Sequence, residues 1–552
     1  MHSVAIHVAA EVRRHVAWSR KDVWIACALA CFSVLYLWPF RAAFTNPNPD
    51  EGIVLQGAVR VLQGQVPYRD FFSFYAPGSF YWNALLMKLF GDTALVPRTA
   101  LLGYGALFSL LTFVLARRLA SRRGAVLVTL LLLACGLPVA FIVIHNWDST
   151  VAALIALYCV VLLLERPRSW LAAVAGLSVG IAILFNQARG AGLLFGLVLG
   201  LLILRTLLAR KDLEAKYFAW LVGGALAPLV ITAVLFAGAG AWNQMVACLM
   251  WPFRHYSAVN HLPYGFVTMP IDDWVHLLAS PVPQRTIYFM VLSLIWLICA
   301  LPIFVVLVAG ANLFQLRRDL APEHIGIVVL CGAVTLGSVL SVQATRPDFY
   351  HITFISPLYF FLLPWIFTEW IRPFSSLRKI GPLAMVYLLV TAAAYGMTLF
   401  WLARNSAYRQ QTRRGEIRIL QPNQTIPFIE ANFPAGSALL IHPYLPLYSF
   451  LTRTITPLPY DFFQPGMHSR QQFQEGADRL AELKPPAVLF QPDFTLVIPS
   501  AWPRTPPAAL NDPIADYIVR NYKVCKRLDS ATPTSFLFMV RKDLRCGSYK
   551  LE

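Results

Sequence analysis

The sequence predicts a mainly α-helical membrane protein, in which about eleven transmembrane helices precede a small extracytoplasmic α/β domain. The first observation behind this prediction is composition, because 57% of the 552 residues are hydrophobic and only 13% are charged. Soluble proteins carry about 25% charged residues, and a bilayer can hold far more apolar sequence than a soluble core. The other two observations are the spacing of the apolar runs and the different character of residues 404–552.

Eleven apolar runs are separated by polar loops. The first run, 23–40, follows a basic N-terminus and lacks a clear cleavage site, which predicts an uncleaved signal anchor; a cleaved signal peptide is the alternative. Closely spaced runs, such as 124–144 and 149–164, predict helical hairpins and not single long helices. The remaining runs lie at 95–116, 170–186, 190–208, 217–237, 286–314, 324–343, 352–370 and 380–402.

Basic residues concentrate in every second loop. The positive-inside rule places these loops and the N-terminus in the cytoplasm. The net charge of +18 therefore reflects membrane topology, and no nucleic-acid partner is expected. We expect a multi-pass protein of the plasma (inner) membrane, with a cytoplasmic N-terminus and an extracytoplasmic (periplasmic) C-terminal domain. The basic loops are 117–123, 165–168, 205–216, 315–319 and 372–379.

The tail forms a predicted second domain, 404–552, after a transmembrane module, 1–403. Its short apolar runs alternate with helical patterns, which predicts a small α/β domain. Cys525 and Cys546 are the only cysteines of the tail. Because an extracytoplasmic compartment favours oxidation, we expect them to form a disulfide, with two unpaired thiols as the alternative. Strands are expected at 438–442, 487–491 and 535–541, and helices at 425–432, 470–483 and 513–521.

Two adjacent carboxylates, Asp50 and Glu51, follow the first apolar run in the predicted outer loop 41–94. Such a pair can take a proton from an acceptor hydroxyl or amine, or hold a divalent cation. A purely structural alternative is a solvated helix start, because Asp after Pro is a good N-cap. Amphipathic stretches at 53–62 and 80–90 predict helices that lie in the membrane interface.

Three short loops predicted on this same outer face also concentrate polar residues. Helix capping would explain any one of them, but arginines from different loops could together hold a phosphate bidentately. The aromatic-rich stretch 66–82, which contains Arg69 and Asp70, suits a sugar-stacking wall, a polyprenyl groove or a membrane anchor. The three loops contain His145, Asn146, Trp147 and Asp148; Asn186, Gln187 and Arg189; and Arg346, Asp348, Tyr350 and His351.

These residues together resemble the GT-C glycosyltransferases, in the branch of the protein O-mannosyltransferases and the lipid A aminoarabinose transferases. The first motif is the acidic pair followed by G-x-x-P-Y-x-D-F and P-G-S-F-Y-W within residues 64–82. The second is GLSVGIAILFNQARGAG (176–192), and the third is RPDFYHITFISP (346–357). The resemblance covers nearly the whole chain. It departs at Asn186-Gln187, where aminoarabinose transferases tend to have Lys-Gly-Pro.

The resemblance implies an inverting hexosyl or pentosyl transferase. Its partners would be a polyprenyl-phosphate-linked sugar as donor and a lipid, glycan or protein acceptor on the outer face of the membrane. Asp50 would be the general base, and Glu51 would assist it or orient the acceptor. No cofactor is required, a divalent cation is possible, and no metal ligand is assigned. The implied donor-phosphate ligands are Arg69, Arg189, Arg346 and His351, and the implied substrate-binding residues are Tyr68, Asp70, Tyr75, Asp148 and Asp348.

A multi-pass lipid or sugar transporter or flippase, without transferase activity, is the main alternative. A transporter predicts charged or helix-breaking residues near the middle of several spans, and often an internal repeat. The polar clusters of this sequence lie at loop ends, and we find no internal repeat. The sequence therefore favours the glycosyltransferase, with membrane lipids as its surroundings.

Overall fold

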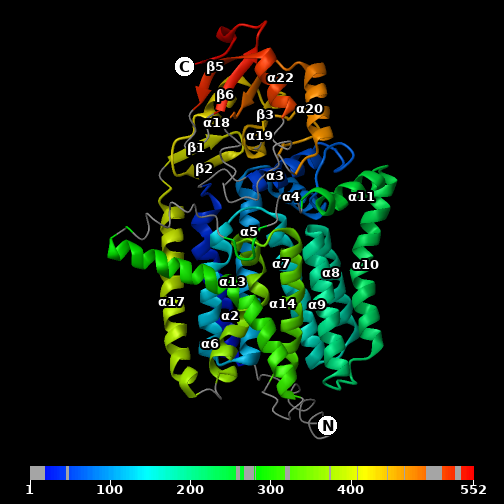
Figure 1. Cartoon of the computed structure of the whole chain (residues 1–552), viewed down its shortest axis with the longest axis vertical. Coiled ribbons are helices and arrows are strands. Elements are labelled where there is room, and N and C mark those ends of the chain that lie inside the picture. The colour runs from blue at the N-terminus through cyan, green and yellow to red at the C-terminus, as the bar shows by residue number, and fades with distance from the viewer. Residues whose placement is uncertain are drawn as a thin grey trace.

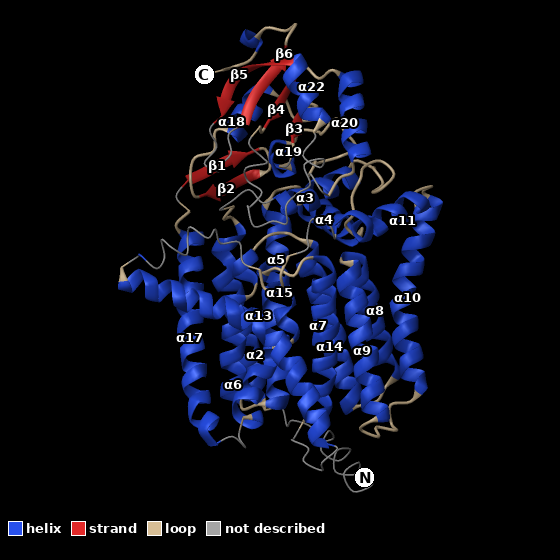
Figure 2. Ribbon diagram, in the orientation of Figure 1, coloured by secondary structure: helices blue, strands red, loops and turns tan. Residues whose placement is uncertain are grey.

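The computed structural model consists of a bundle of long helices with the C-terminal domain stacked on one end (Figure 1). We call this end of the bundle the domain end. Strands occur only in the C-terminal part of the picture, and the bundle itself is helical (Figure 2). The structure describes residues 19–44, 49–256, 262–266, 279, 281–316, 324–371, 375–406, 408–443, 445–464, 467–492, 512–528 and 536–551.

Each predicted apolar run is helical. Nine helices among the described residues are long and apolar enough to cross a membrane. The pair Phe349–Leu358 and Phe360–Trp370, which is bent by 59°, is either a broken tenth span or a re-entrant loop. The run predicted at 170–186 forms the shorter apolar helix α8, Ser169–Phe185. The long helices are α2 (Arg20–Leu37), α5 (Leu95–Leu119), α6 (Arg122–Cys135), α7 (His145–Glu165), α9 (Gln187–Thr206), α10 (Ala215–Gly238), α13 (Val282–Leu316), α14 (Ile325–Thr345) and α17 (Ser375–Arg404).

Glycines set two of the closest helix contacts in the bundle. A side chain at Gly196 of α9 would overlap the backbone of α14 at Ala333 and Val334. A side chain at Gly180 of α8 would likewise overlap the backbone of α10 at Ala225. Small residues let membrane helices approach backbone to backbone, and here they bring the domain ends of α9 and α14 together. Gly180, which belongs to the second sequence motif, therefore has a packing role.

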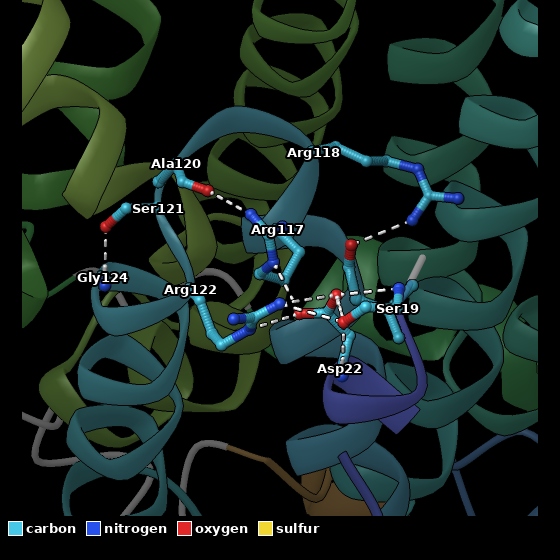
Figure 3. Close-up of polar contacts among 9 residues, drawn as sticks. Ser19, Asp22, Arg117, Arg118, Ala120, Ser121, Arg122 and Gly124 are labelled. Atoms are coloured by element: carbon cyan, nitrogen blue, oxygen red, sulfur yellow. Dashed lines mark hydrogen bonds and ion pairs between the residues drawn. The ribbon is translucent and has the colours of Figure 1, made fainter. Parts of the chain in front are cut away.

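The opposite end of the bundle, which we call the basic end, gathers the loops 117–123, 165–168 and 205–216. Asp22 of α2 accepts hydrogen bonds from Arg117 and Arg122 at 3.1 and 2.8 Å (Figure 3). Asp22 also closes a capping box with Ser19. These contacts join the start of α2 to the α5–α6 loop, as the predicted alternation of loops requires.

The other basic loops are joined at the same end. Arg118 pairs with Glu165 at 2.5 Å, and Arg210 donates to the carbonyl of Leu164 at 2.8 Å. Residues 317–319 and 372–374 of the remaining predicted basic loops, and the arginines before Ser19, lie outside the described residues.

The C-terminal domain contains a four-stranded mixed sheet of order β3-β4-β6-β5 and a separate hairpin, β1-β2. Strand β3 pairs with β4 in parallel, and the other pairs of the sheet are antiparallel. Every predicted strand and helix of the tail is present, whereas β1, β2, β5 and α19 were not predicted. The elements are β1 (Tyr408–Thr412), β2 (Gly415–Ile419), α18 (Thr425–Asn432), β3 (Leu440–His442), α19 (Pro446–Thr452), α20 (Arg470–Leu483), β4 (Ala487–Phe490), α22 (Pro513–Asn521), β5 (Tyr522–Leu528) and β6 (Phe536–Arg541).

The predicted disulfide is confirmed. Cys525 of β5 is bonded to Cys546, with a Cα–Cα distance of 5.6 Å. The bond ties the edge strand of the sheet to the segment that follows β6. The other seven cysteines are free thiols, and none of them lies in the C-terminal domain.

Three helices lie between the bundle and the C-terminal domain: α3 (Pro49–Leu62), α4 (Gly78–Phe90) and α11 (Trp242–Trp251) (Figure 1). The prediction that 53–62 lies in the membrane interface is wrong. Helix α3 is buried almost all round, because α19 covers the face that an interfacial helix would turn to lipid headgroups. Helix α4, by contrast, exposes Tyr81, Leu85 and Leu89 along one face, as an interfacial helix should.

Candidate active site

Asp50 lies in the first turn of α3, at the domain end of the bundle. The hydroxyl of Tyr75 donates a hydrogen bond to its Oδ1 at 3.2 Å. The Tyr75 ring in turn packs on the ring of His145, with 4.1 Å between centroids. Three segments that are distant in sequence thus meet around one partly buried carboxylate.

Arg189 occupies the first turn of α9 and is 3% exposed. Its Nη1 donates to the carbonyl of Asn146 at 2.9 Å and to the hydroxyl of Thr150 at 3.1 Å. Its Nε is buried and has no hydrogen-bond partner in the described part of the chain. A buried guanidinium nitrogen without an acceptor is costly, so this group is suited to an anion that is not part of the protein.

His145 and Asn146 begin α7 beside Arg189. The Nδ1 atom of His145 and the Nδ2 atom of Asn146 are also buried without a partner among the described residues. Arg189 and His351 both lie within electrostatic range of the His145 ring. Helix α7 starts without a side-chain cap, and the partial positive charge of such a start favours anions.

The third loop reaches the same place from the end of α14. Asp348 caps the next helix, α15 (Phe349–Ile355), by accepting from the backbone N–H of His351. The His351 ring lies 2.7 Å from the same carboxylate, and Arg346 pairs with its other oxygen at 2.7 Å. Burial opposes ionisation of Asp348, but the charges of His351 and Arg346 outweigh it and hold its pKa at about 2. Asp348 is therefore ionised and orients the Arg346 guanidinium and the His351 ring.

Glu51 has an environment quite different from that of Asp50. It is fully buried, and Arg98 binds both of its carboxylate oxygens, at 2.7 and 2.5 Å. Its Oε1 also accepts from the backbone N–H of Val143 at 3.1 Å. Arg98 lies over the ring of Phe44 as well, 3.5 Å from its centroid. The pair Glu51–Arg98 thus ties the start of α3 to α5 and to the segment before α7.

Two of the predicted substrate-binding residues have structural contacts. Asp148 is buried and accepts from the hydroxyls of Ser79 and Tyr104 at 2.6 and 2.7 Å. The buried Tyr68 donates from its hydroxyl to the carbonyl of Tyr75 at 2.7 Å, which fixes the backbone next to Asp50. Both residues therefore have a structural role next to the site.

Arg69 and Asp70 are not brought to the cluster. They pair with each other at 2.8 Å with exposed side chains, and Arg69 also donates to the carbonyl of Ala239 after α10. The Arg69 guanidinium holds the pKa of Asp70 below its ordinary value, against the effect of burial. This pair is a surface contact between the first loop and α10.

The structure therefore joins Asp50, Tyr75, Arg189, Arg346, Asp348 and His351 at the domain end, and it adds His145, Asn146 and Arg98. The sequence shows His145 and Asn146 only as members of a polar loop. Arg98 gave no signal, because an arginine at the start of a hydrophobic span is normally an interfacial residue. Among the described residues, no group of three or more His, Cys, Asp or Glu side chains is placed to hold a metal ion.

Several known proteins resemble this chain, either in a segment of sequence or in fold. Residues 75–236 match the family of dolichyl-phosphate-mannose-protein mannosyltransferases. The fold is similar to that of ArnT from Cupriavidus metallidurans, solved with undecaprenyl phosphate, at 13% identity and a TM-score of 0.54; the match covers 93% of this chain and 97% of that one. No curated protein matches the chain in sequence.

A second solved structure has the same likeness. It is the archaeal oligosaccharyltransferase AglB from Archaeoglobus fulgidus, in complex with an inhibitory peptide and a dolichol-phosphate, at 11% identity and a TM-score of 0.54. The match covers 95% of this chain and 75% of that one. The chain therefore has the fold of these two solved membrane proteins, and one segment of it matches the mannosyltransferase family. It is a multi-pass membrane protein with a small C-terminal α/β domain.

Proposed function

We propose that this protein transfers a sugar from a polyprenyl-phosphate donor to a lipid, glycan or protein acceptor, with Asp50 as the general base. The observation that carries the proposal is the set of contacts that runs from Asp50 through Tyr75 to His145, which lies beside Asn146 and Arg189; these last three residues retain unpaired polar atoms. These groups come from α3, α7 and α9 and converge at one end of the bundle. The solved relatives bind undecaprenyl phosphate and dolichol-phosphate, which have the same chemistry as the leaving group proposed here.

The donor phosphate would be held at the starts of α7 and α9. Arg189 supplies its buried guanidinium, and His145 and Asn146 supply ring and amide nitrogens beside it. Arg346 adds a positive charge and His351 adds a ring nitrogen, and Asp348 orients both side chains. Charge-assisted hydrogen bonds of this kind stabilise a phosphate as it leaves, since negative charge develops on it while its bond to the anomeric carbon breaks.

Asp50 would take the proton of the acceptor. As the proton moves to its carboxylate, the acceptor oxygen or nitrogen bonds to the anomeric carbon, and the bond from that carbon to the phosphate oxygen breaks. The products are the glycosylated acceptor and polyprenyl phosphate, and attack opposite the leaving group inverts the anomeric centre. Tyr75 would orient the Asp50 carboxylate through its hydroxyl. Glu51 is already paired in the interior, so we assign it to holding the loop and not to proton transfer.

We propose that the domain end faces away from the cytoplasm. The disulfide Cys525–Cys546 lies in the C-terminal domain, and such bonds persist in oxidising compartments. The arginine-rich loops lie at the opposite end, where the positive-inside rule expects the cytoplasm. Donor, acceptor and active site would then meet on the outer face of the membrane.

The transporter alternative has less support. In the described spans, charged side chains lie within about a turn of a helix end, as Arg98, Asp148 and Arg189 do. A translocation pathway would need such groups near the membrane midplane. An assay of sugar-lipid flipping in vesicles with the purified protein separates the two functions, because a transferase moves no intact donor across the bilayer.

The proposal is tested by replacing Asp50 with Asn in the full-length protein. Membranes are supplied with polyprenyl-phosphate-linked arabinose, mannose, glucose or galactose, and release of polyprenyl phosphate is measured together with sugar transfer. A general base contributes roughly 10²- to 10⁴-fold, so transfer should fall by at least 100-fold while binding of undecaprenyl phosphate is retained. Asp70→Asn, in the exposed pair, is the control and should transfer normally. Wild-type transfer by Asp50→Asn would refute the function.

A further inference from the structure

The C-terminal domain covers the helix that carries Asp50. Two residues after Asp50, Gly52 faces the start of α19 so closely that a Cβ at this position would overlap the backbone nitrogen of Leu447. It would also lie 2.9 Å from the Leu447 Cα. These are backbone atoms, so no change of side-chain rotamer can relieve the overlap. The first turn of α3 is therefore pressed directly against the domain.

The segment before the acidic pair is held by the β1-β2 hairpin. The backbone N–H of Phe44 donates to the carbonyl of Arg418 in β2, and the N–H of Arg418 donates to the carbonyl of Ala42, both at 2.8 Å. Arg98 donates to the carbonyl of Ala43 at 2.8 Å and binds Glu51. A continuous set of hydrogen bonds thus runs from the C-terminal domain to the residue beside Asp50.

The other end of α3 is fixed by an ion pair with the same domain. Arg60 donates from Nε and Nη2 to Oδ1 of Asp461, at 3.0 and 2.8 Å, and from Nη2 to the carbonyl of Leu458 at 3.0 Å. Both side chains are about 5% exposed. A buried pair with this many hydrogen bonds has one favourable geometry, so it sets the position of the helix along its axis.

The loop that leads to Tyr75 is held in the same way. The backbone N–H of Phe72 donates to the carbonyl of Pro459 at 2.8 Å, and its ring contacts those of Tyr460 and His468. The indole of Trp251 in α11 donates to the carbonyl of Met467 at 2.8 Å. The first loop and α11 thus share one interface with the domain.

Among the described residues, the proposed phosphate ligands Arg189, His145 and Asn146 make no hydrogen bond to the C-terminal domain. Arg189 donates instead to the carbonyl of Asn146 and the hydroxyl of Thr150, and all of these residues belong to helices of the bundle. We propose that the two halves of the active site are positioned separately: the bundle positions the phosphate ligands, and the C-terminal domain positions the Asp50 carboxylate. Gly52 and Arg60 are then positioning residues, and the domain is a structural part of the catalytic unit.

This inference rests on the proposed transfer reaction, and the test uses the full-length protein. Gly52→Ala forces α3 away from α19, and a displacement of about 1 Å at a reacting group can cost roughly 100-fold in rate. We expect kcat for sugar transfer to fall by about that factor, with an unchanged KM for the donor and unchanged binding of undecaprenyl phosphate. Gly103→Ala on α5, where an added Cβ meets open space, is the matched control and should behave as wild type.

Arg60→Lys provides a second test should Gly52→Ala fail to fold. Lysine keeps the charge but cannot make the bidentate contacts with Asp461, so kcat should fall by about tenfold at constant KM. Wild-type kcat in both variants would overturn the inference, and so would a loss of undecaprenyl phosphate binding in proportion to kcat. Failure of the proposed function itself is distinguished by Asp50→Asn. An active Asp50→Asn protein refutes the reaction, whereas an inactive Asp50→Asn protein together with wild-type kcat in both Gly52→Ala and Arg60→Lys refutes only the positioning by the domain.

Discussion

The two ends of the helix bundle both gather arginines, but they satisfy them differently. At the basic end, Arg117 and Arg122 converge on Asp22, and each has its acceptor within the chain (Figure 3). At the domain end, Arg189 keeps a buried Nε without a partner in the described part of the chain. Both clusters join helices that are distant in sequence. Of these two clusters, only the one around Arg189 has a buried arginine nitrogen without a partner among the described residues; Arg210, which lies at the basic end outside the Asp22 cluster, also has an unpaired Nη1.

The presence of a buried donor without a partner distinguishes a ligand-binding site from a structural cluster better than charge or position does. From sequence, the loop of Arg117 and the loop of Arg189 look alike, because each is a short polar segment between two apolar runs. The structure distinguishes the two loops by whether the arginine of each loop has hydrogen-bond acceptors for its buried nitrogens within the described part of the chain. A cationic cluster whose hydrogen bonds are complete stabilises the fold, whereas one with unmet donors at two helix starts can bind an anion.

The largest effect should follow from separating the helices that assemble the domain-end cluster. Gly196→Leu would force α9 away from α14, because the added side chain overlaps backbone atoms of Ala333 and Val334. Overpacking of this kind costs about 1–3 kcal/mol or more, and Arg189 would move away from Arg346. We expect sugar transfer to fall by more than 100-fold. Gly223→Leu on α10, where an added Cβ meets open space, is the control and should keep both stability and transfer.

A smaller effect, on stability alone, is expected at the basic end. Asp22→Asn removes the charge shared by Arg117 and Arg122 and leaves two cations without a counter-ion. The loss of charge-assisted hydrogen bonds should destabilise the protein by about 2–3 kcal/mol. Thermal unfolding of the purified protein measures this loss. Transfer per folded molecule should remain that of wild type, and a large decrease in it would erase the proposed distinction between the two ends.

His468 sharpens the comparison, because it too has a buried nitrogen without a partner among the described residues. Its Nε2 is unpaired, and the rings of Phe72, Phe462 and Phe463 pack around it. Burial lowers the pKa of His468 to about 3. The backbone N–H of Gln464 donates to its Nδ1. Its role should be structural.

The smallest expected effect is therefore a dependence of stability on pH. The unfolded histidine, with a pKa of about 6.5, takes up a proton below that pH, while the folded one stays neutral until about pH 3. Stability is full above pH 6.5 and should fall by about 2 kcal/mol by pH 5. His468→Asn keeps an acceptor for Gln464 and should lose this contribution to the pH dependence. Unfolding midpoints at pH 7.5 and pH 5 measure it, and an equal acid sensitivity of both proteins would contradict the assignment.

Much of the architecture could be predicted from the sequence. The apolar runs gave the helices of the bundle, and the predicted bounds of α18, α20 and α22 agree with the structure, because their patterns are local. The disulfide could be predicted because the tail holds only two cysteines. The apolar positions of α3 could be predicted from its pattern. The element that covers them, α19, could not be predicted, because it lies some 400 residues later in the chain.

The site was only partly predictable for the same reason. Asp50 and Glu51 are neighbouring carboxylates with the same chemistry. The sequence could not show that Arg98 binds Glu51 in the interior. Arg69 and Arg189 looked equally suited to a phosphate, yet Arg69 is paired with Asp70 at the surface. Which polar groups remain unpaired depends on contacts between distant segments. Neither periodicity nor motif spacing contains that information.

The most direct test of the account is the binding of undecaprenyl phosphate to three full-length proteins: wild type, Arg189→Gln and Arg122→Gln. Each variant removes one arginine, at the domain end and at the basic end respectively. A charge-assisted contact contributes about 1.5–3 kcal/mol, so Arg189→Gln should bind roughly 10- to 150-fold more weakly. Arg122→Gln should bind as wild type, even if it unfolds at a lower temperature. Equal affinities of Arg189→Gln and wild type, or an equal loss in both variants, would contradict the account.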